Sequence, residues 1–396
     1  MRNIINMKKI GLCICYSVKN YGSMLQAYAT QQYIGKSGFD YEIIKYNKKH
    51  DLKFLLTSCF KLFNSNFRKE VIRRFSYKKS LNSNPNFKKN LYIRNSKFEE
   101  FEKANFNNVS ENCSTYSQLQ EKGKEFPAYL VGSDQLWLPA GLSTNFYNLN
   151  FAAEDSVKIS YATSFGVSNI PWYQRKRTSA YLNRIQFLSV REQKGVEIIK
   201  NIAHREATLV VDPTLLLSES DWNLYIPTKK LIEEDYIFVY FIGNNPDQRK
   251  KVLELKEKTD CKIVVLKHID EYIPSDEEFG DIELYDIGPA EFVNLIRYAK
   301  YVCTDSFHGS VFSIINKKSF IVFNRFGDAE KNSTNSRIDS LCNILNLKDR
   351  RFDKNQDIYN QITKSIDYDE IEDTLGSLRK SSEDFLHKAF LAVKER

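Results

Sequence analysis

The sequence lacks the cysteine patterns and the apolar runs that mark metal-stabilised, disulfide-bonded or membrane-spanning proteins. Its seven cysteines form no Cys-x-x-Cys pair, and the close pair Cys13 and Cys15 lies in an apolar stretch. We therefore expect no structural zinc site, and reduced thiols in a cytosol. No apolar run is long enough to cross a bilayer, and the run 10–15 is too short for the core of a signal peptide. A soluble, cytoplasmic protein is expected.

Motifs of several catalytic classes are missing as well. There is neither a G-x-x-x-x-G-K-[ST] loop nor a G-x-G-x-x-G fingerprint, so ATP hydrolysis and dinucleotide binding of the usual type have no support. No G-x-S-x-G occurs, and no cysteine has the local signature of a nucleophile. An aromatic RNA-binding motif and a recognition helix are also missing, so no nucleic acid is expected as a partner.

Short apolar segments alternate with amphipathic ones along most of the chain, and strand after strand ends in a polar or glycine-containing turn. This order is typical of open α/β sheets that carry a site at one rim. The 396 residues suffice for two such domains. The polar segment 218–234 is predicted to link them, with one domain over 1–225 and the other over 226–396. The expected strands are 10–15, 41–46, 128–131, 158–161, 187–190, 209–211, 236–242, 262–266, 299–304 and 320–323. The expected helices are 24–36, 173–185, 195–202, 246–258, 290–299, 309–315 and 368–395.

One segment carries the basic character of the chain. Residues 45–103 contain sixteen Lys or Arg against five Asp or Glu, and apolar residues are interleaved with the basic ones. Such a stretch can lie on an anionic membrane surface or hold a polyanionic substrate. An ordinary helical face in contact with solvent gives the same pattern, so these alternatives stay open.

A histidine follows a predicted buried strand at the point where a helix begins. The run 301–310 predicts a strand to 304, a tight turn over 305–308 and a helix from Gly309. Ligands of parallel sheets bind outside the carboxyl ends of the strands, and free N–H groups at a helix start attract anions. His308 is thus either a proton donor beside an anion site or a structural histidine. Asp305 is expected either to orient His308 or to cap the helix.

Several short motifs, in this order along the chain, together resemble the polysaccharide pyruvyl transferase family. They are Asn-Tyr-Gly at 20–22 with 25–29, Val-Gly-Ser-Asp-Gln-Leu-Trp at 131–137, Val-Arg-Glu at 190–192, Val-Asp-Pro-Thr at 211–214 and Thr-Asp-Ser-Phe-His-Gly at 304–309. The resemblance extends from residue 10 to about residue 347. It implies two Rossmann-like domains that face each other across a cleft, the GT-B arrangement. It also implies an enzyme that transfers pyruvate from phosphoenolpyruvate to a sugar as a ketal, in exopolysaccharide or capsule synthesis at the cell surface.

The resemblance also implies roles for single residues. His308 matches the family's general acid, and Asp134 is either a base toward an acceptor hydroxyl or the cap of a turn. Arg191 is the first choice for binding phosphoenolpyruvate, unless it forms a surface pair with Glu192. The other expected contacts to phosphoenolpyruvate are Arg325, Ser306, Gly309 and Ser310, with Lys317, Lys318 and Arg337 as further basic candidates. The acceptor side is expected at Asn20, Tyr21 and Gly22.

No metal or cofactor is implied besides the donor substrate, because arginines can neutralise phosphoenolpyruvate. The expected acceptor is a sugar linked to undecaprenyl diphosphate, which would bring the enzyme to the inner face of the plasma membrane, with segment 45–103 in peripheral contact with anionic lipid. Two other interpretations stay open. One is a GT-B nucleotide-sugar glycosyltransferase, and the other is a non-catalytic carbohydrate-binding protein.

Overall fold

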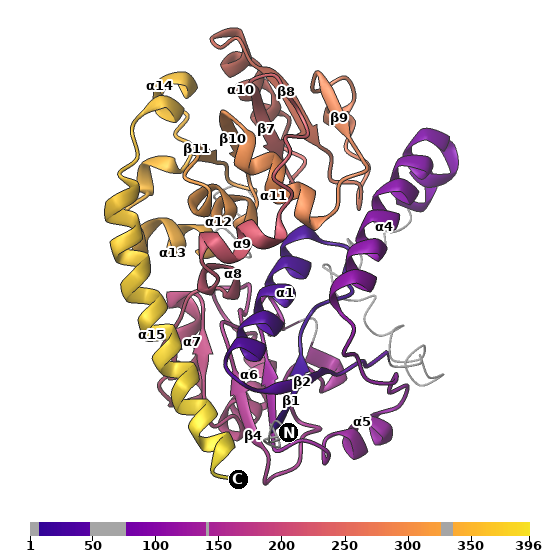
Figure 1. The fold of residues 1–396 in the computed structure, drawn as a ribbon, viewed down its shortest axis with the longest axis vertical. Helices are drawn as coiled ribbons and strands as arrows, with labels where there is room; N and C mark the ends of the chain where they lie inside the picture. Colours follow the sequence, from indigo (N-terminus) through magenta and orange to yellow (C-terminus); the bar gives the residue numbers. More distant parts are fainter. Residues whose placement is uncertain (1–7, 48–76, 140–141, 326–335) are drawn as a thin grey trace, which may run out of the picture.

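The computed structural model describes residues 8–47, 77–139, 142–325 and 336–396, and two parallel β-sheets lie one above the other along its long axis (Figure 1). The first sheet has the order β2-β1-β3-β4, and a small parallel pair, β5-β6, continues it through bridges from Ile159 to Phe187 and from Thr163 to Val190. These strands are β1 (Lys9–Cys13), β2 (Asp40–Ile43), β3 (Ala128–Val131), β4 (Val157–Ser160), β5 (Ser189–Val190) and β6 (Thr208–Leu209).

The second sheet has the order β11-β10-β7-β8-β9, so the strand that leads to His308 pairs with β11 on one side and with β7 on the other. All pairings are parallel, as the alternation of strands and helices predicts. The strands are β7 (Tyr236–Tyr240), β8 (Lys262–Leu266), β9 (Ile282–Leu284), β10 (Tyr301–Thr304) and β11 (Ser319–Val322).

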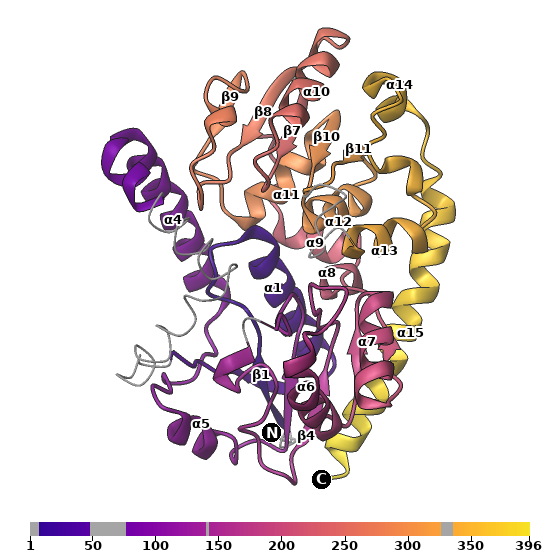
Figure 2. The same cartoon turned by 180° about the vertical axis from the view of Figure 1, so that it is seen from behind.

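Helices cover both faces of each sheet (Figures 1 and 2). On the first sheet, alternate residues of one strand point to opposite faces. Leu130 packs in the core cluster with residues of α1 and α15, and Tyr129 packs in the cluster with residues of α5, α6 and α7. The helices are α1 (Tyr21–Lys36), α4 (Pro85–Asn105), α5 (Tyr116–Lys122), α6 (Trp172–Arg184), α7 (Gln193–Ala203), α8 (Pro213–Leu216), α9 (Glu219–Tyr225), α10 (Pro246–Glu257), α11 (Pro289–Tyr298), α12 (Phe307–Ile315), α13 (Ser336–Ile344), α14 (Ile358–Thr363) and α15 (Tyr368–Lys394).

The last helix returns to the first sheet. Along α15, the ring of Phe385 lies 6.4 Å from that of Tyr161 after β4, and the ring of Phe390 lies 4.8 Å from that of Phe39. Helix α15 thus covers a face of the first sheet although it follows the second in the chain (Figure 2). The domain boundary expected between residues 225 and 226 falls between α9 and β7 and stays a prediction.

Segment 218–234 differs from the polar linker that its composition predicts. It begins with α9, because Ser218 accepts a hydrogen bond from Asp221 N while the Asp221 carboxylate accepts one from Ser218 N. Trp222 of this helix is 1% exposed, and its Nε1 donates to Thr214 O at 3.0 Å. A buried tryptophan in a capped helix is part of the core. The residues after α9 are also held in place, because the buried Asn294 of α11 donates to Pro227 O at 2.6 Å and to Lys229 O at 3.0 Å.

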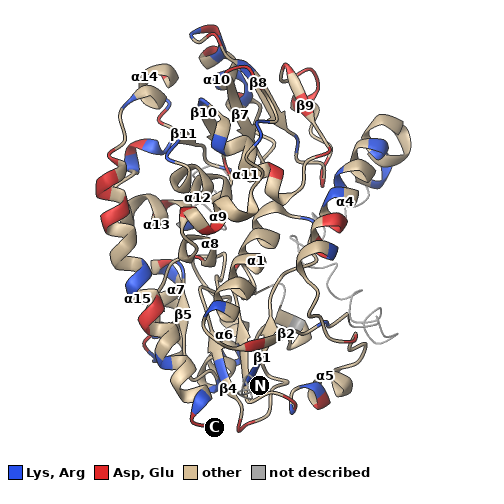
Figure 3. Cartoon of the chain, in the orientation of Figure 1, with Lys and Arg blue, Asp and Glu red and all other residues tan. Residues whose placement is uncertain are grey.

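The basic segment is only partly described, since residues 48–76 lie outside the described residues. Its remainder includes α4, in which Lys and Arg outnumber Asp and Glu (Figure 3). Arg94 of α4 is buried and pairs with Asp270 at 2.6 Å, and Lys97 pairs with Glu100 at 3.0 Å. Some of the positive charge of α4 is therefore neutralised within the protein.

Within the described ranges, no helix combines the length and the apolar character that crossing a bilayer requires. The same part of the chain contains no cluster of three His, Cys, Asp or Glu side chains suited to a metal ion.

Candidate functional site

Helix α12 begins directly after the central strand β10 of the second sheet, and it starts two residues earlier than its sequence predicts. Ser306 caps it, because its Oγ accepts a hydrogen bond from Gly309 N at 3.3 Å. His308 is therefore in the first turn of the helix and not in the preceding loop. The carboxylate of Asp305 accepts hydrogen bonds from Ile242 N and Gly243 N, both at 2.7 Å. Asp305 thus connects the end of β10 to the residues that follow β7. It neither caps α12 nor orients His308, the two roles expected for it.

The other two small residues of this motif also serve α12 itself. The Ser310 hydroxyl donates to Ser306 O at 2.9 Å. A Cβ atom on Gly309 would lie 2.6 Å from Thr304 Oγ1, so the absence of a side chain lets the helix pack closely on β10. Gly309 N donates to Ser306 Oγ and Ser310 N donates to Ser306 O, so the N–H groups of Phe307 and His308 are the ones in this turn that can attract an anion. The expected contacts of Ser306, Gly309 and Ser310 to phosphoenolpyruvate stay predictions.

The imidazole of His308 is buried between the two halves of the chain. Its side chain is 8% exposed, and Nε2 lies 3.7 Å from Asp212 Oδ1. Nε2 has no hydrogen-bond partner among the described residues. On the other edge of the ring, a Cβ atom on Gly22 of α1 would lie only 2.0 Å from Nδ1. The start of α1 therefore forms a wall against which the imidazole is held.

Arg191, at the end of β5, holds two carboxylates of the first half of the chain. Its Nη1 lies 2.5 Å from Asp212 Oδ2, and its Nη2 lies 3.2 Å from Asp134 Oδ1. Burial alone would lower the pKa of Arg191, and the charges of Asp212 and Asp134 raise it above its usual value. Nε is buried and has no hydrogen-bond partner among the described residues. Arg191 is thus an interior residue and not half of a surface pair, and most of its donors are in use within the protein.

Asp212 connects this guanidinium to His308. Oδ1 accepts hydrogen bonds from Thr214 N at 3.1 Å and from Thr214 Oγ1 at 2.8 Å, and Oδ2 accepts one from Ser133 Oγ at 2.8 Å. Burial opposes ionisation of Asp212, but His308 and Arg191 hold the pKa of its carboxyl well below the usual range. Asp212 is therefore a charged, fixed partner that can orient the imidazole.

Asp134 is the more accessible of the two carboxylates, with a side chain 19% exposed. It has a φ of +72° in the turn after β3, and its Oδ2 accepts a hydrogen bond from Ser23 Oγ at 2.6 Å. Burial opposes its ionisation, but Arg191 and His308 hold the pKa of its carboxyl below the usual value. An ionised carboxylate next to His308 is able to accept a proton, and the role of Asp134 as a base stays a prediction.

Two further arginines stand near the start of α12 from the second half of the chain. The ring of Phe307 lies between charges, 4.5 Å from Arg191 Cζ and 5.8 Å from Arg337 Cζ. Burial and the charge of Arg191 lower the pKa of Arg337 to about 10. With the amide of Gln135 oriented so that its oxygen faces Arg337, this oxygen accepts from Nε at 3.2 Å and from Nη2 at 3.1 Å. Arg325 Nη2 donates to Asp305 O at 3.2 Å.

The basic candidates therefore separate into two groups. Arg191, Arg325 and Arg337 lie around the start of α12, and the charges of the first two lower the pKa of Arg337. Lys317 and Lys318 follow the other end of α12, about 13 Å away along a helix of nine residues. The Lys318 ammonium donates to Arg297 O at 3.0 Å. The structure thus brings the arginines to His308 and leaves the two lysines apart.

The residues expected on the acceptor side form the cap and the start of α1, which begins three residues before the expected helix 24–36. Asn20 caps α1 by accepting a hydrogen bond from Ser23 N at 3.1 Å. Tyr21 is 2% exposed, its ring stacks on Phe292 at 4.8 Å, and its hydroxyl donates to Ile287 O at 3.0 Å. A sugar could stack on Tyr21 only if its ring left these contacts. The acceptor role of residues 20–22 stays a prediction. The contacts of Tyr21 with Phe292 and Ile287 show that this tyrosine packs the start of α1 against the second half of the chain.

Sequence reasoning missed two features of the site, the role of Asp212 and the contact between Gly22 and His308. Asp212 lies in the Val-Asp-Pro-Thr motif after β6, and its position at the end of a strand is the one signal that points to it. The contact of Gly22 with His308 joins residues 286 positions apart. Such contacts between distant segments leave no periodic pattern in either segment.

Comparisons with known proteins agree with this arrangement. The family model described as polysaccharide pyruvyl transferase matches residues 20–325. No curated protein matches the chain. Among solved structures, a UDP-N-acetylglucosamine 2-epimerase is similar with a TM-score of 0.53 at 11% identity, over 98% of this chain and 97% of that one. A putative UDP-N-acetylglucosamine 2-epimerase from Listeria monocytogenes is similar with a TM-score of 0.51 at 9% identity, over 94% and 91% of the two chains. These structures show the fold, and the expected GT-B-like arrangement is confirmed.

Proposed function

The chain belongs to the polysaccharide pyruvyl transferase family and is a transferase, and we propose that it moves pyruvate from phosphoenolpyruvate to two hydroxyls of one sugar in a bacterial polysaccharide precursor. The products are a pyruvate ketal and inorganic phosphate. The observation that carries the proposal is the buried His308, whose Nε2 has no hydrogen-bond partner within the described ranges and which lies in the first turn of α12, around whose start three arginines lie. The placement supports a proton donor beside a bound anion.

The reaction needs one proton at the methylene carbon of phosphoenolpyruvate. His308 is the proposed donor of this proton, and the negative charge of Asp212, whose Oδ1 lies 3.7 Å from Nε2, favours the charged imidazole. The C2 carbon then becomes cation-like, and a sugar hydroxyl attacks it. The bond from C2 to the phosphate oxygen breaks, phosphate leaves, and the second hydroxyl closes the ketal ring. The two hydroxyls lose two protons, and Asp134 is the proposed group that accepts them in turn. One of these protons restores the charged imidazole of His308, and the other leaves with the phosphate.

The anionic groups of phosphoenolpyruvate need cations with unused donors. Arg325 and Arg191 each have a buried Nε without a hydrogen-bond partner among the described residues. Arg337 is buried beside Phe307 and has a lowered pKa, which an incoming anion would raise. We therefore assign the phosphate and the carboxylate to these three side chains and to the first turn of α12.

The acceptor that we propose is a sugar carried on undecaprenyl diphosphate at the inner face of the plasma membrane. The positive charge of segment 45–103 supports this proposal, because basic segments are attracted to anionic lipid. Peripheral contact of this segment with the membrane would place the active site near the carrier lipid.

A ligand panel and a turnover assay test the function. Phosphoenolpyruvate is expected to raise the melting temperature of the protein, because a ligand that binds only the native state stabilises it. UDP and GDP are expected to leave it unchanged. Phosphate release should require both phosphoenolpyruvate and a saccharide acceptor, and His308→Ala should lower the rate about 10²–10⁴-fold. Stabilisation by a nucleotide and not by phosphoenolpyruvate would favour a nucleotide-sugar glycosyltransferase and contradict the proposal. Saccharide binding without phosphate release would favour a non-catalytic binding protein.

A further inference from the structure

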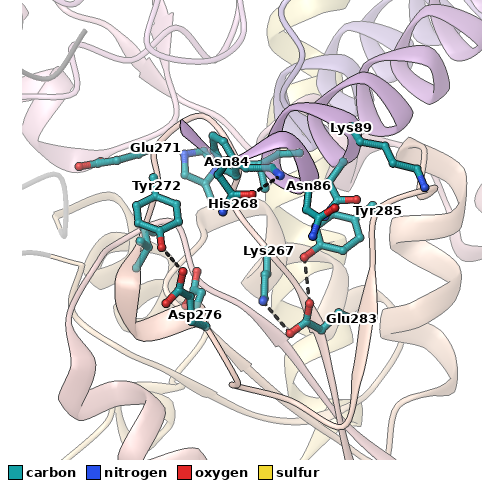
Figure 4. Close-up of a pocket in the computed structure, with 15 residues that line it drawn as sticks. Asn84, Asn86, Lys89, Lys267, His268, Glu271, Tyr272, Asp276, Glu283 and Tyr285 are labelled. Atoms are coloured by element: carbon teal, nitrogen blue, oxygen red, sulfur yellow. Dashed lines mark hydrogen bonds and ion pairs between the residues drawn. The ribbon is translucent and has the colours of Figure 1, made fainter. Parts of the chain in front are cut away.

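A cavity of about 320 Å³ lies between the N-terminal part of α4 and the loops that follow β8 and β9 (Figure 4). We call it the α4 pocket. Helix α4 contributes Asn86, Phe87 and Asn90, and the loops contribute Tyr272 and Tyr285. The volume is in the usual range of small-molecule sites, which begins near 300 Å³. The pocket is separate from the cluster around His308, since neither His308 nor the three arginines line it.

Aromatic rings and hydrogen-bonding groups alternate around the α4 pocket. The rings of Phe87 and Tyr272 meet edge to face at 5.7 Å. The Tyr285 hydroxyl donates to Glu283 Oε2 at 2.9 Å, and Figure 4 shows this pair within the pocket. The amide of Asn86 is exposed on α4. A sugar ring combines apolar C–H faces with a belt of hydroxyls, so aromatic faces together with amides and carboxylates complement it.

The charge of the lining disfavours an anion. Lys267 is paired with Glu283 at 2.6 Å, and Asp276 is paired with Arg249 at 2.8 Å. Burial lowers the pKa of His268 to about 4, so this histidine adds no positive charge at neutral pH. The other charged residues of the lining are two carboxylates, Glu271 and Glu277, and one ammonium, Lys89. A negative lining repels phosphate and carboxylate groups, whereas the arginines around His308 attract them. The two sites therefore suit different ligands.

The α4 pocket and His308 share one rim of the second sheet. His308 follows β10, while His268 and Tyr285 follow β8 and β9. In the strand order β10-β7-β8-β9 these positions are two and three strands from β10, which is roughly 10–15 Å at a spacing of about 4.8 Å per strand. Arg325 lies on the way, because it contacts Asp305 and its charge also lowers the pKa of His268. This separation exceeds the width of one sugar ring.

We propose that the α4 pocket binds an uncharged sugar residue of an oligosaccharide acceptor, removed along the chain from the sugar that receives pyruvate. The inference rests on the proposed function, in which phosphoenolpyruvate binds at the arginines and His308. The distal part of the acceptor would then bind at α4. One face of the basic segment thereby becomes part of the acceptor site.

Binding of neutral saccharides to the full chain tests the proposal without catalysis. The probes are methyl glycosides of glucose, galactose, mannose and N-acetylglucosamine, and linear trisaccharides of the same sugars, observed by ligand-detected NMR. At least one trisaccharide is expected to bind the wild type. Tyr272→Ala and Asn86→Ala should weaken its binding at least about fivefold, since each removes one contact of order 1 kcal/mol. Tyr92→Ala is the matched control, because Tyr92 is a tyrosine of the same helix, is 76% exposed and lies outside the pocket.

Three results would overturn the inference. The first is that no member of the panel binds at tens of millimolar. The second is that both pocket variants bind as tightly as the wild type, or that Tyr92→Ala weakens binding equally. The third is that phosphoenolpyruvate displaces the trisaccharide, which would place the sugar at the arginines. A failure of the proposed function has a different signature, because phosphoenolpyruvate would then neither stabilise the protein nor release phosphate, whatever the saccharides do.

Discussion

Replacement of Gly22 by alanine tests whether the start of α1 holds the imidazole of His308. The added Cβ would lie 2.0 Å from Nδ1 and 2.5 Å from Cγ. Favourable contacts between such atoms need about 3.5–4.0 Å, so the ring or the helix has to move by more than about 1 Å. A rotation of the ring changes the distance from Nε2 to Asp212, and a shift of α1 separates the two halves of the site. Either movement misplaces the proposed proton donor.

The expected effects follow from these movements. Forcing a methyl group into a packed site costs about 1–3 kcal/mol of unfolding free energy. Alanine recovers up to about 1 kcal/mol over glycine in a helix, so Gly22→Ala should be destabilised by up to about 2 kcal/mol. A displacement of about 1 Å at a reacting group costs roughly 10²-fold in turnover. Urea unfolding measures the first quantity, and phosphate release at saturating phosphoenolpyruvate measures the second.

Gly35 offers the matched control on the same helix. A Cβ atom at Gly35 meets nothing within 4 Å, so Gly35→Ala should keep its activity and gain up to about 1 kcal/mol of stability. If Gly22→Ala had the same free energy of unfolding and the same rate of phosphate release as Gly35→Ala, the close contact between α1 and His308 would be refuted. Loss of stability with full activity would show that the position of the ring does not govern the reaction.

Three other perturbations address the rest of the structure. Asp212→Asn should cost about 3–5 kcal/mol at pH 7, because it breaks a buried pair with Arg191. The folded-state pKa of Asp212 is depressed, so its contribution to the free energy of unfolding is fully present above about pH 4 and is lost progressively as the pH falls below that value. Urea unfolding at pH 7 and at about pH 3 should therefore show a smaller difference between wild type and Asp212→Asn in acid, and an equal difference at the two pH values would contradict this. Asp305→Ala should cost about 2–4 kcal/mol, since two backbone N–H groups lose their acceptor, whereas the exposed Asp247→Ala should change the unfolding free energy by less than about 0.5 kcal/mol. Wild type should float with anionic liposomes more than a variant with Lys or Arg changed to Ser within 45–103, and equal flotation would reject membrane contact by this segment.

The sequence predicts the local elements better than the contacts between them. The strands expected at 128–131 and 262–266 have the observed bounds, because each is a short apolar run between polar turns. The start of α12 was misplaced, since the Ser306 cap is a hydrogen bond that hydrophobic periodicity does not contain. His308 was identified as the candidate acid from its position after a strand and from the family motif.

Its immediate partners come from elsewhere in the chain. Asp212 is 96 positions away from His308, and the ring contacts that bury Tyr21 reach Phe292. Such pairs form only when both halves fold and meet, so no window of sequence can show them. For this reason the sequence predicts ligand contacts for Arg191 and Tyr21 but not their partners inside the protein. These partners are two carboxylates for Arg191, and the Phe292 ring and a backbone carbonyl for Tyr21.

The return of α15 to the first sheet has a consequence for synthesis of the protein. Residues 368–394 supply Phe385 and Phe390, which cover Tyr161 and Phe39. Domains generally fold from the N-terminus as the chain leaves the ribosome. Here part of one apolar face of the sheet that is synthesised first stays uncovered until α15 has been synthesised. Ribosome-bound chains that end before residue 368 should therefore expose this part of the face to chaperones, and the emergence of residues 368–394 is the step that covers it.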